Sequence, residues 1–335
     1  MEFSSVLTTV ESHAGGEPLR IVTGGVPRIP GGTMLEKRRW VRENLDHVRC
    51  ALMLEPRGHA DMYGAYITEP VSREAELGVI FMHNEGYSDM CGHGVIALAT
   101  VAVAQGLVTR SVPETRVGID SPAGFVEAFV EWDGRRAGAV RFVNVPSFLH
   151  TRDLSVTTQN FGAVTVDVAF GGAFYAYLDA AQVGLEVAPP RVAELIQAAT
   201  EIKRAVMERV DVFHPLEPEL RGIYGTILSG PPRTAGGSQR NVCVFADRQV
   251  DRSPTGTGTA GRVAQLVARG QLAVGGTIVN ESIVGSVFTG RALSMTSVGE
   301  FEAVETEIAG RAAIIGLNTW VVDPDDELGR GFFLR

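Results

Sequence analysis

The sequence has few cysteines, no long apolar run and no excess of basic residues, and each shortage excludes a class of protein. Its three cysteines, Cys50, Cys91 and Cys243, are odd in number and far apart, which argues against a disulfide framework and favours a reducing compartment. No stretch reaches the roughly 20 apolar residues that a membrane-spanning helix requires. The first residues also lack the basic and apolar regions of a secretory signal. We therefore expect a cytoplasmic protein.

The chain also has no surplus of positive charge. Its 39 acidic and 30 basic residues give a net charge of −9, whereas a partner such as nucleic acid or an anionic membrane requires a basic face. We expect neither partner, and the charge leaves a small-molecule substrate open. The length of 335 residues favours two domains, and an apolar content of 45% is sufficient for two cores.

The most informative stretch is Cys91-Gly92-His93-Gly94, which leads into a run without charged side chains from Val95 to Thr109. A run that is apolar on every face predicts a buried helix. Cys91 then lies at the first turn, where unpaired N–H groups and the helix dipole lower the pKa of a thiol. The same N–H groups can bind a carboxylate. Taken alone, Cys91 is more simply a small buried residue, as most free cysteines are.

A second copy of this stretch favours a functional role for Cys91 over simple burial. Thr255-Gly256-Thr257-Gly258 again precedes a helical segment, Thr259 to Arg269, and aligns with the first copy. The match continues downstream, where Asp120-Ser121 corresponds to Glu281-Ser282. This self-similarity predicts an internal duplication, with two α/β halves that each offer a helix N-terminus to a shared cleft. A separate amphipathic helix is predicted over 192–206.

Two other patterns have competing interpretations. Gly256 to Gly261 reads G-x-G-x-x-G, with Glu281 following 20 residues later, as in a dinucleotide site. A polar link, Asp247 to Pro254, separates it from the preceding strand, so we favour a turn that binds a small carboxylate. The segment Glu55 to Asp61 gathers carboxylates and a histidine, but its spacing fits no metal-ligand pattern. We expect a solvated turn there and no metal.

The remaining polar candidates stay open on position alone. Asp251 could hold the ammonium of an amino acid, or could be a solvated charge or the partner of Arg252. His93 could contact a substrate or cap its own helix. Cys50 and Cys243 lie in apolar runs and are most simply buried thiols.

Five segments together resemble the proline racemase family across essentially the whole chain. The segments are His13 to Pro18, Glu55 to Gly64, Met90 to Gly94, Asp251 to Gly258, and Asn318 to Trp320. The resemblance implies an α/β (α+β) fold of two pseudo-symmetric halves, each a mixed sheet wrapped around a central helix, as also in diaminopimelate epimerase. We expect the first half to span 1–135, completed by 318–335, and the second to span 136–317. The family needs no cofactor.

The resemblance also implies roles for individual residues. Cys91 matches the catalytic cysteine of the first half, and Asp251 matches the carboxylate near the substrate nitrogen. The position of the second catalytic cysteine is occupied by Thr255. This Cys/Thr combination resembles the members that dehydrate trans-3-hydroxy-L-proline. The positions that bind the substrate, chiefly its carboxylate, are Gly92, His93, Gly256 and Thr257.

The acid strengths of the Cys91 and Thr255 side chains also favour dehydration over racemisation. Racemisation needs a second acid to deliver a proton to the opposite face of the α-carbon, and a threonine hydroxyl is far too weak an acid for that. With one base, loss of the 3-hydroxyl as water is the natural outcome, giving Δ2-pyrroline-2-carboxylate and then the Δ1-imine. The alternatives are a proline racemase or 4-hydroxyproline 2-epimerase, and a non-catalytic amino-acid-binding protein. A homodimer is possible.

Overall fold

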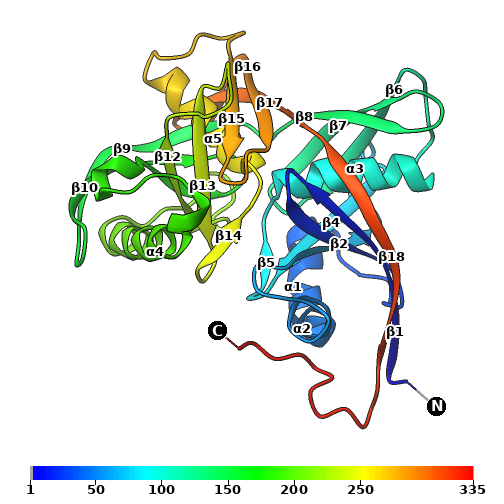
Figure 1. Cartoon of the computed structure of the whole chain (residues 1–335). Helices are drawn as coiled ribbons and strands as arrows, with labels where there is room; N and C mark the ends of the chain where they lie inside the picture. The colour runs from blue at the N-terminus through cyan, green and yellow to red at the C-terminus, as the bar shows by residue number, and fades with distance from the viewer. Residues whose placement is uncertain (1–2, 335) are drawn as a thin grey trace. The chain divides into compact units, whose positions relative to one another are not determined.

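The computed structural model describes residues 3–334, which form two compact units (Figure 1). Within the described residues, unit 1 comprises 3–141 and 311–334, and unit 2 comprises 142–310. The sequence predicts divisions after residue 135 and before residue 318, whereas the chain changes unit after Arg141 and before Arg311. The first change falls inside a strand, β8 (Ala137–Val143), between Arg141 and Phe142, neither of which is a residue that interrupts a strand.

Unit 1 contains a mixed sheet of β1 (Ser5–Ala14), β2 (Glu17–Gly24), β3 (Tyr63–Thr68), β4 (Leu77–His83), β5 (Tyr87–Ser88), β6 (Glu114–Ser121), β7 (Gly124–Trp132) and β18 (Ala312–Val322). β1 pairs antiparallel with both β18 and β2, and β2 pairs parallel with β3. β4 pairs antiparallel with β3 and β5 and parallel with β6, which pairs antiparallel with β7.

Unit 2 contains a second mixed sheet of β9 (Ser147–Thr158), β10 (Gly162–Phe170), β11 (Phe174–Asp179), β12 (Ile223–Gly230), β13 (Gln239–Phe245), β14 (Gln249–Asp251), β15 (Thr277–Ser282), β16 (Val287–Val298) and β17 (Phe301–Gly310). β10 pairs antiparallel with β9 and β11, and β11 pairs parallel with β12. β13 pairs antiparallel with β12 and β14 and parallel with β15, which pairs antiparallel with β16.

The two sheets repeat one pattern of pairing, strand for strand, and the predicted duplication is therefore present in the topology. In both, a parallel pair is joined by a helical crossover, as parallel strands require. The crossover is α1 (Met34–Asn44) and α2 (Asp46–Met53) in unit 1, and α4 (Val192–Arg209) in unit 2. In both, a helix also joins the short strand to the next parallel strand: α3 (Gly92–Gln105) follows β5, and α5 (Gly256–Ala268) follows β14.

The helix α3 is the buried helix that its uncharged sequence predicts. Every residue from Gly92 to Val103 is buried, and the helix contacts β1, β2, β6, β7 and β18. It ends at Gln105, earlier than the apolar run, because Gly106 adopts a left-handed conformation with φ of 71° and caps the helix. The mixed α+β fold, with a sheet wrapped around a central helix, is confirmed for unit 1.

In unit 2 the two helices cover different strands. α5 contacts β9, β10, β11, β16 and β17, whereas α4 contacts β9, β11, β12 and β13. The amphipathic prediction for α4 is confirmed, because Leu195, Ala199, Ile202 and Val206 are buried while Glu194 is exposed. The short loop of residues 252–255 leads from the end of β14 into the first turn of α5.

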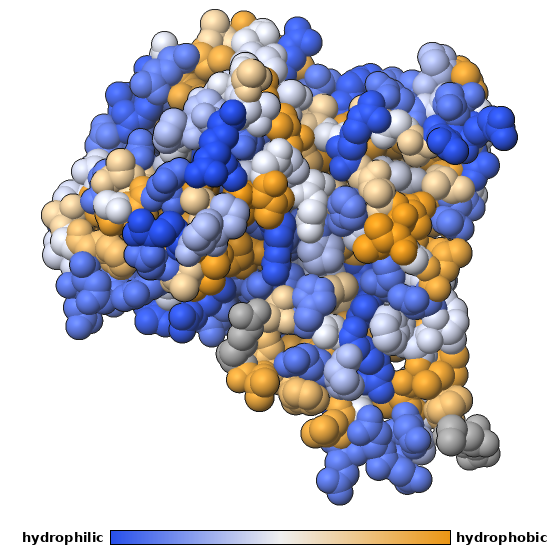
Figure 2. Space-filling model, in the orientation of Figure 1, coloured by the Kyte–Doolittle hydropathy of each residue, from blue (hydrophilic) through white to orange (hydrophobic). Residues whose placement is uncertain are grey.

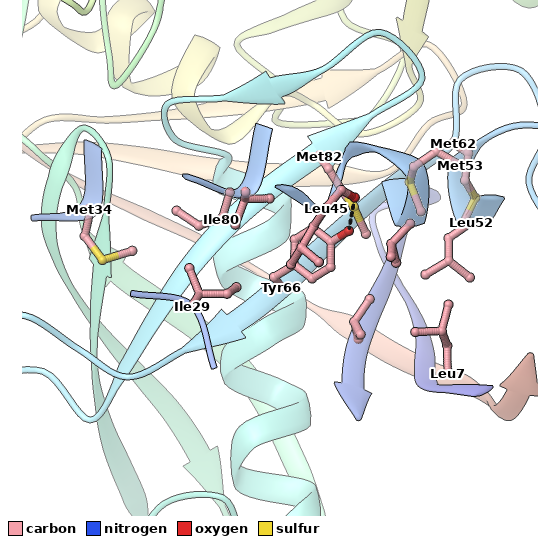
Figure 3. Packing of buried hydrophobic residues seen from close by; sticks show 13 residues of the cluster. Leu7, Ile29, Met34, Leu45, Leu52, Met53, Met62, Tyr66, Ile80 and Met82 are labelled. Carbon is pink, nitrogen blue, oxygen red and sulfur yellow. Dashed lines mark hydrogen bonds between the residues drawn. The ribbon is translucent and has the colours of Figure 1, made fainter. Parts of the chain in front are cut away.

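The crossover helices of unit 1 close a core against its sheet. Figure 3 shows Tyr66 of β3 beside Leu45, which lies between α1 and α2, and the Tyr66 hydroxyl donates to the Leu45 carbonyl at 3.4 Å. Met53 of α2 and Met82 of β4 belong to the same cluster of buried residues. The core therefore anchors β4, the strand that leads through β5 to α3.

The surface mixes residue types over short distances. On the face shown in Figure 2, hydrophilic and hydrophobic residues are interspersed. Across residues 3–334, no helix is both long and apolar enough to cross a membrane.

Candidate active site

Cys91 occupies the N-cap of α3, one position before the first turn. Its backbone is extended, with φ of −143° and ψ of 113°, and its side chain is 5% exposed. The sulfur accepts a hydrogen bond from the N–H of Gly94 at 3.3 Å. A backbone donor and the positive end of the helix dipole both favour a thiolate over a thiol. The structure therefore gives Cys91 the environment of a base or nucleophile.

His93 lies against the same sulfur. Its Nδ1 is 3.1 Å from the Cys91 sulfur, and its Nε2 is 3.3 Å from the carbonyl oxygen of Pro18. A carbonyl only accepts hydrogen bonds, so Nε2 carries the proton and Nδ1 of a neutral ring presents its lone pair to the sulfur. The Tyr63 ring meets the imidazole edge-on, with centroids 4.9 Å apart. His93 can therefore accept the thiol proton and leave a thiolate beside it.

Gly94 is required by packing at this helix start. A Cβ atom added there would overlap the ring of Phe81, a fully buried residue of β4. We expect Gly94→Ala to lower the free energy of unfolding by about 1–3 kcal/mol and to reduce turnover by moving the start of α3. Thermal unfolding and initial rates measure the two effects.

Gly86→Ala is the matched control, since its added Cβ meets open space. Equal losses of stability and of rate in the two variants would contradict this account.

Thr255, the counterpart of Cys91, adopts a strained conformation at the N-cap of α5. Its φ is 63° and its ψ is 92°, a region that β-branched residues rarely occupy and that costs about 1–3 kcal/mol. Its side chain is 4% exposed, and within the described residues its hydroxyl oxygen has no hydrogen-bond partner. Strain and a buried unpartnered hydroxyl at one residue indicate a position held for a ligand.

A network of buried side chains holds the loop before Thr255 in place. The carbonyl of Pro254 accepts hydrogen bonds from the side-chain amides of Asn241 and Asn280, both at 3.0 Å, and from the Thr259 hydroxyl at 3.1 Å. Sequence reasoning missed both asparagines. Asn241 follows Gln239 and Arg240 in β13, and Asn280 precedes Glu281 in β15, so neither amide stood out among its polar neighbours.

Asp251 ends β14 as a buried carboxylate, 4% exposed. Its Oδ1 accepts the N–H of Ser253 at 2.7 Å, and the Ser253 hydroxyl accepts the N–H of Thr255 at 3.0 Å. The Arg252 guanidinium donates to the Val250 carbonyl instead, and within residues 3–334 Asp251 forms no ion pair. A buried carboxylate without a protein cation favours a cationic ligand, because burial of an uncompensated charge is costly.

The first turn of α5 is fixed by two tyrosines of β11. The hydroxyls of Thr257 and Tyr175 are 2.7 Å apart, and the Tyr177 hydroxyl donates to the Gly258 carbonyl at 2.9 Å. Gly256 begins the helix and is buried. The leading N–H groups of a helix have no intrahelical acceptor, so this turn can bind an anion.

The dinucleotide interpretation of the second glycine motif is not supported at Glu281. Its carboxylate accepts the N–H groups of Arg233 and Thr234, at 2.7 and 2.8 Å. Its duplicate, Asp120, accepts two N–H groups from the corresponding loop of unit 1, those of Val71 and Ser72, at 2.7 and 2.8 Å. Both acids therefore tie a loop to its sheet. Across the described chain, no group of three His, Cys, Asp or Glu side chains is arranged to hold a metal ion.

The other two cysteines differ from each other. Cys243 is a buried thiol, 1% exposed, as predicted. Cys50 is only half-buried, and the prediction for it was wrong because it lies at the helix surface beside Asp46 and Arg49. Burial raises the pKa of the Cys50 thiol, with the Arg49 charge acting in the opposite direction.

The predicted site residues thus gather at two helix starts. One holds Cys91, Gly92 and His93 at α3. The other holds Asp251 and the first turn of α5, with Thr255, Gly256 and Thr257. The helix start in unit 1 thus offers a thiol, and its duplicate in unit 2 offers a hydroxyl and a carboxylate.

The model of the family described as proline racemase matches residues 9–333, so this chain belongs to that family. It is 60% identical, over the full length of both chains, to a trans-3-hydroxy-L-proline dehydratase of Burkholderia ambifaria. It is 59% identical, again over both full lengths, to a protein of Burkholderia multivorans named 3-hydroxyproline 2-epimerase. A trans-L-3-hydroxyproline dehydratase of Xenopus tropicalis is 44% identical over 98% of this chain and 96% of its own length.

Solved structures agree with the family. A hydroxyproline epimerase of Agrobacterium vitis, crystallised with trans-4-hydroxy-L-proline, has a TM-score of 0.93 and 30% identity, covering 100% of this chain and 96% of its own. A methylitaconate-delta-isomerase has a TM-score of 0.55 at 15% identity, covering 95% and 96%, and so shares the fold alone.

Proposed function

We propose that this protein is a trans-3-hydroxy-L-proline dehydratase, a cofactor-independent hydro-lyase of the cytoplasm. The observation that carries the proposal is the difference between the duplicated helix starts: Cys91 caps α3, whereas Thr255 occupies the same position at α5. Two of the three curated relatives described above carry the dehydratase name, which supports the same activity. A homodimer stays a prediction.

Substrate binding follows from the charges at the two helix starts. The first-turn N–H groups of Gly92, His93, Gly256 and Thr257 bind the substrate carboxylate, as helix N-termini bind anions. The buried carboxylate of Asp251, which forms no ion pair within residues 3–334, binds the ring ammonium. A positively charged nitrogen and a bound carboxylate both stabilise negative charge developing at the α-carbon.

Elimination then requires one base. The Cys91 thiolate removes the α-proton, the electron pair of that C–H bond forms the Cα=Cβ double bond, and the C3–O bond breaks. The proton taken by sulfur and the departing hydroxide together make one water, so the reaction needs no co-reactant. The product is Δ2-pyrroline-2-carboxylate, which tautomerises to the Δ1-imine. The Thr255 hydroxyl, which has no hydrogen-bond partner within residues 3–334, hydrogen-bonds the bound substrate.

The decisive experiment is incubation with trans-3-hydroxy-L-proline and detection of the cyclic imine with o-aminobenzaldehyde. We expect imine formation, at the same rate before and after dialysis against a strong chelator. Binding of the substrate without turnover would instead assign the protein to the non-catalytic class. A rate abolished by the chelator and restored by a metal would refute cofactor independence.

The epimerase name of the Burkholderia multivorans relative makes isomerisation the second candidate. The same incubation in D2O separates the two reactions. An epimerase returns deuterium at the α-carbon of the D-epimer and keeps the 3-hydroxyl, whereas a dehydratase loses water. Efficient formation of the D-epimer by the wild type would move the protein to the epimerase class.

We expect Thr255→Cys to gain a detectable epimerase activity on L-proline and trans-4-hydroxy-L-proline, which lack a leaving group at C3. The new thiol at a helix N-cap would supply the second acid that racemisation needs. The dehydratase rate should fall because the hydroxyl contact is lost. Chiral chromatography and deuterium wash-in measure the gain.

Thr255→Val is the matched control, since it keeps the branched shape but carries neither hydroxyl nor thiol. It should lose dehydratase rate and gain no epimerase activity. D-epimer formation by both variants would contradict the role assigned to the thiol.

A further inference from the structure

Gln249, the first residue of β14, has a buried side chain whose amide is not hydrogen-bonded by any residue that the structure describes. The residue is 2% exposed, and within the described residues neither its Nε2 nor its Oε1 has a hydrogen-bond partner. A primary amide carries two donors and one acceptor, and native proteins rarely bury all of them unpaired. An orphaned amide in a native fold therefore indicates a missing partner.

The position of Gln249 relates it to Asp251. Side chains alternate along a strand, so Gln249 and Asp251 lie on one face of β14, about 7 Å apart at the backbone, and Val250 lies on the other. β13 places Phe245 opposite Gln249 and Cys243 opposite Asp251, so these side chains share that face.

The same face is directed toward the start of α5. Asn241 also lies on it, two residues before Cys243 on β13, and its amide donates to the carbonyl of Pro254 at 3.0 Å. Pro254 immediately precedes the strained Thr255. The unpartnered amide of Gln249 and the unpaired carboxylate of Asp251 thus belong to one buried polar face beside this helix start.

The charge of Asp251 limits which chemical group of a ligand can bind beside the Gln249 amide. A substrate carboxylate would be repelled by Asp251, so the group bound beside it is the cationic one. The ring nitrogen of a protonated proline is a secondary ammonium with two N–H donors. A carboxylate satisfies one of them, and a neutral acceptor satisfies the other without adding a second negative charge.

We propose that Gln249 is a further substrate-binding residue, whose Oε1 accepts the second N–H of the ring ammonium while Asp251 accepts the first. The assignment deepens the proposed function and rests on it. Two acceptors fix the orientation of the nitrogen, and with it the direction of the α-C–H bond. Two acceptors also match a secondary ammonium, which has two N–H donors, better than a primary one, which has three.

The first test compares Gln249→Met with Gln265→Met. Gln265 is also buried, but its amide is satisfied, because Oε1 accepts from Arg262 at 2.6 Å and Nε2 donates to Asp167 at 2.6 Å. Gln249→Met should keep or raise the Tm and lower kcat/KM for trans-3-hydroxy-L-proline by roughly 10–100-fold, since a hydrogen bond to a charged group is lost. Gln265→Met should lower the Tm and keep kcat/KM. Unchanged kcat/KM in Gln249→Met would overturn the proposal.

The second test reads the nitrogen contact without the reaction. L-Proline and tetrahydrofuran-2-carboxylate are competitive ligands that differ in the ring atom, NH2+ in one and oxygen in the other. Gln249→Met should weaken the binding of L-proline roughly 10-fold or more and leave that of tetrahydrofuran-2-carboxylate unchanged, as measured by calorimetry. Equal weakening of both, or of neither, would refute the ammonium contact. A wild type that binds L-proline but forms no imine from trans-3-hydroxy-L-proline would refute the dehydratase function and leave the ammonium contact standing.

Discussion

Cys91→Ser should lower kcat for trans-3-hydroxy-L-proline by roughly 10³-fold or more while the protein stays folded. A serine hydroxyl is a far weaker acid than a thiol, so the variant has no base to remove the α-proton. Serine is a preferred N-cap residue and can accept the Gly94 N–H that the sulfur accepts now, so α3 should keep its stability. Imine formation and thermal unfolding, measured on the same sample, separate the two effects.

Cys50→Ser is the matched control for this variant. Cys50 is a thiol of the same unit, half-buried beside Asp46, with a pKa raised by burial, and its replacement should leave kcat unchanged. Iodoacetamide should inactivate the wild type, and pyrrole-2-carboxylate should slow that inactivation by occupying the site. Full turnover in Cys91→Ser, or inactivation traced to Cys50, would refute the assignment of the base.

Asp251→Asn should lower kcat/KM by roughly 10²-fold or more, because a buried charge-assisted contact to the ring ammonium becomes a neutral one. The acidity of the α-carbon depends on that ammonium being held and charged, so kcat should fall as well as substrate affinity. The asparagine oxygen can still accept the Ser253 N–H, which preserves the turn before Thr255. Initial rates over a range of substrate concentrations measure both constants.

Asp251→Ala serves as the comparison, since it removes the charge and the turn contact together. It should show the same loss of activity and, in addition, a lower Tm. A kcat/KM for Asp251→Asn equal to that of the wild type would remove Asp251 from the site. If only Asp251→Ala lost activity, its role would be to shape the loop.

Some of this site could be predicted because its signals are local. The glycines after Cys91 and the uncharged run that follows them specify a buried helix with a thiol at its start. The match of Thr255 to Cys91 required only comparison of the chain with itself. The role of Gln249 could not be predicted in this way, since a glutamine in a short strand is ordinarily solvated. Asn241 and Asn280 were missed for a similar reason, because their shared acceptor, Pro254, is distant from them in sequence.

The sequence by itself determined that the chain is duplicated, that one copy begins its helix with Cys91 and that the other begins with Thr255, since these facts depend on residue identity and short-range spacing. Only the tertiary structure decided that Thr255 is strained and that, among residues 3–334, the Thr255 hydroxyl and the Gln249 amide have no hydrogen-bond partner and Asp251 has no ion pair. Each of these depends on which atoms surround a buried group. Those neighbours come from strands and helices far apart along the chain, and local spacing does not specify them.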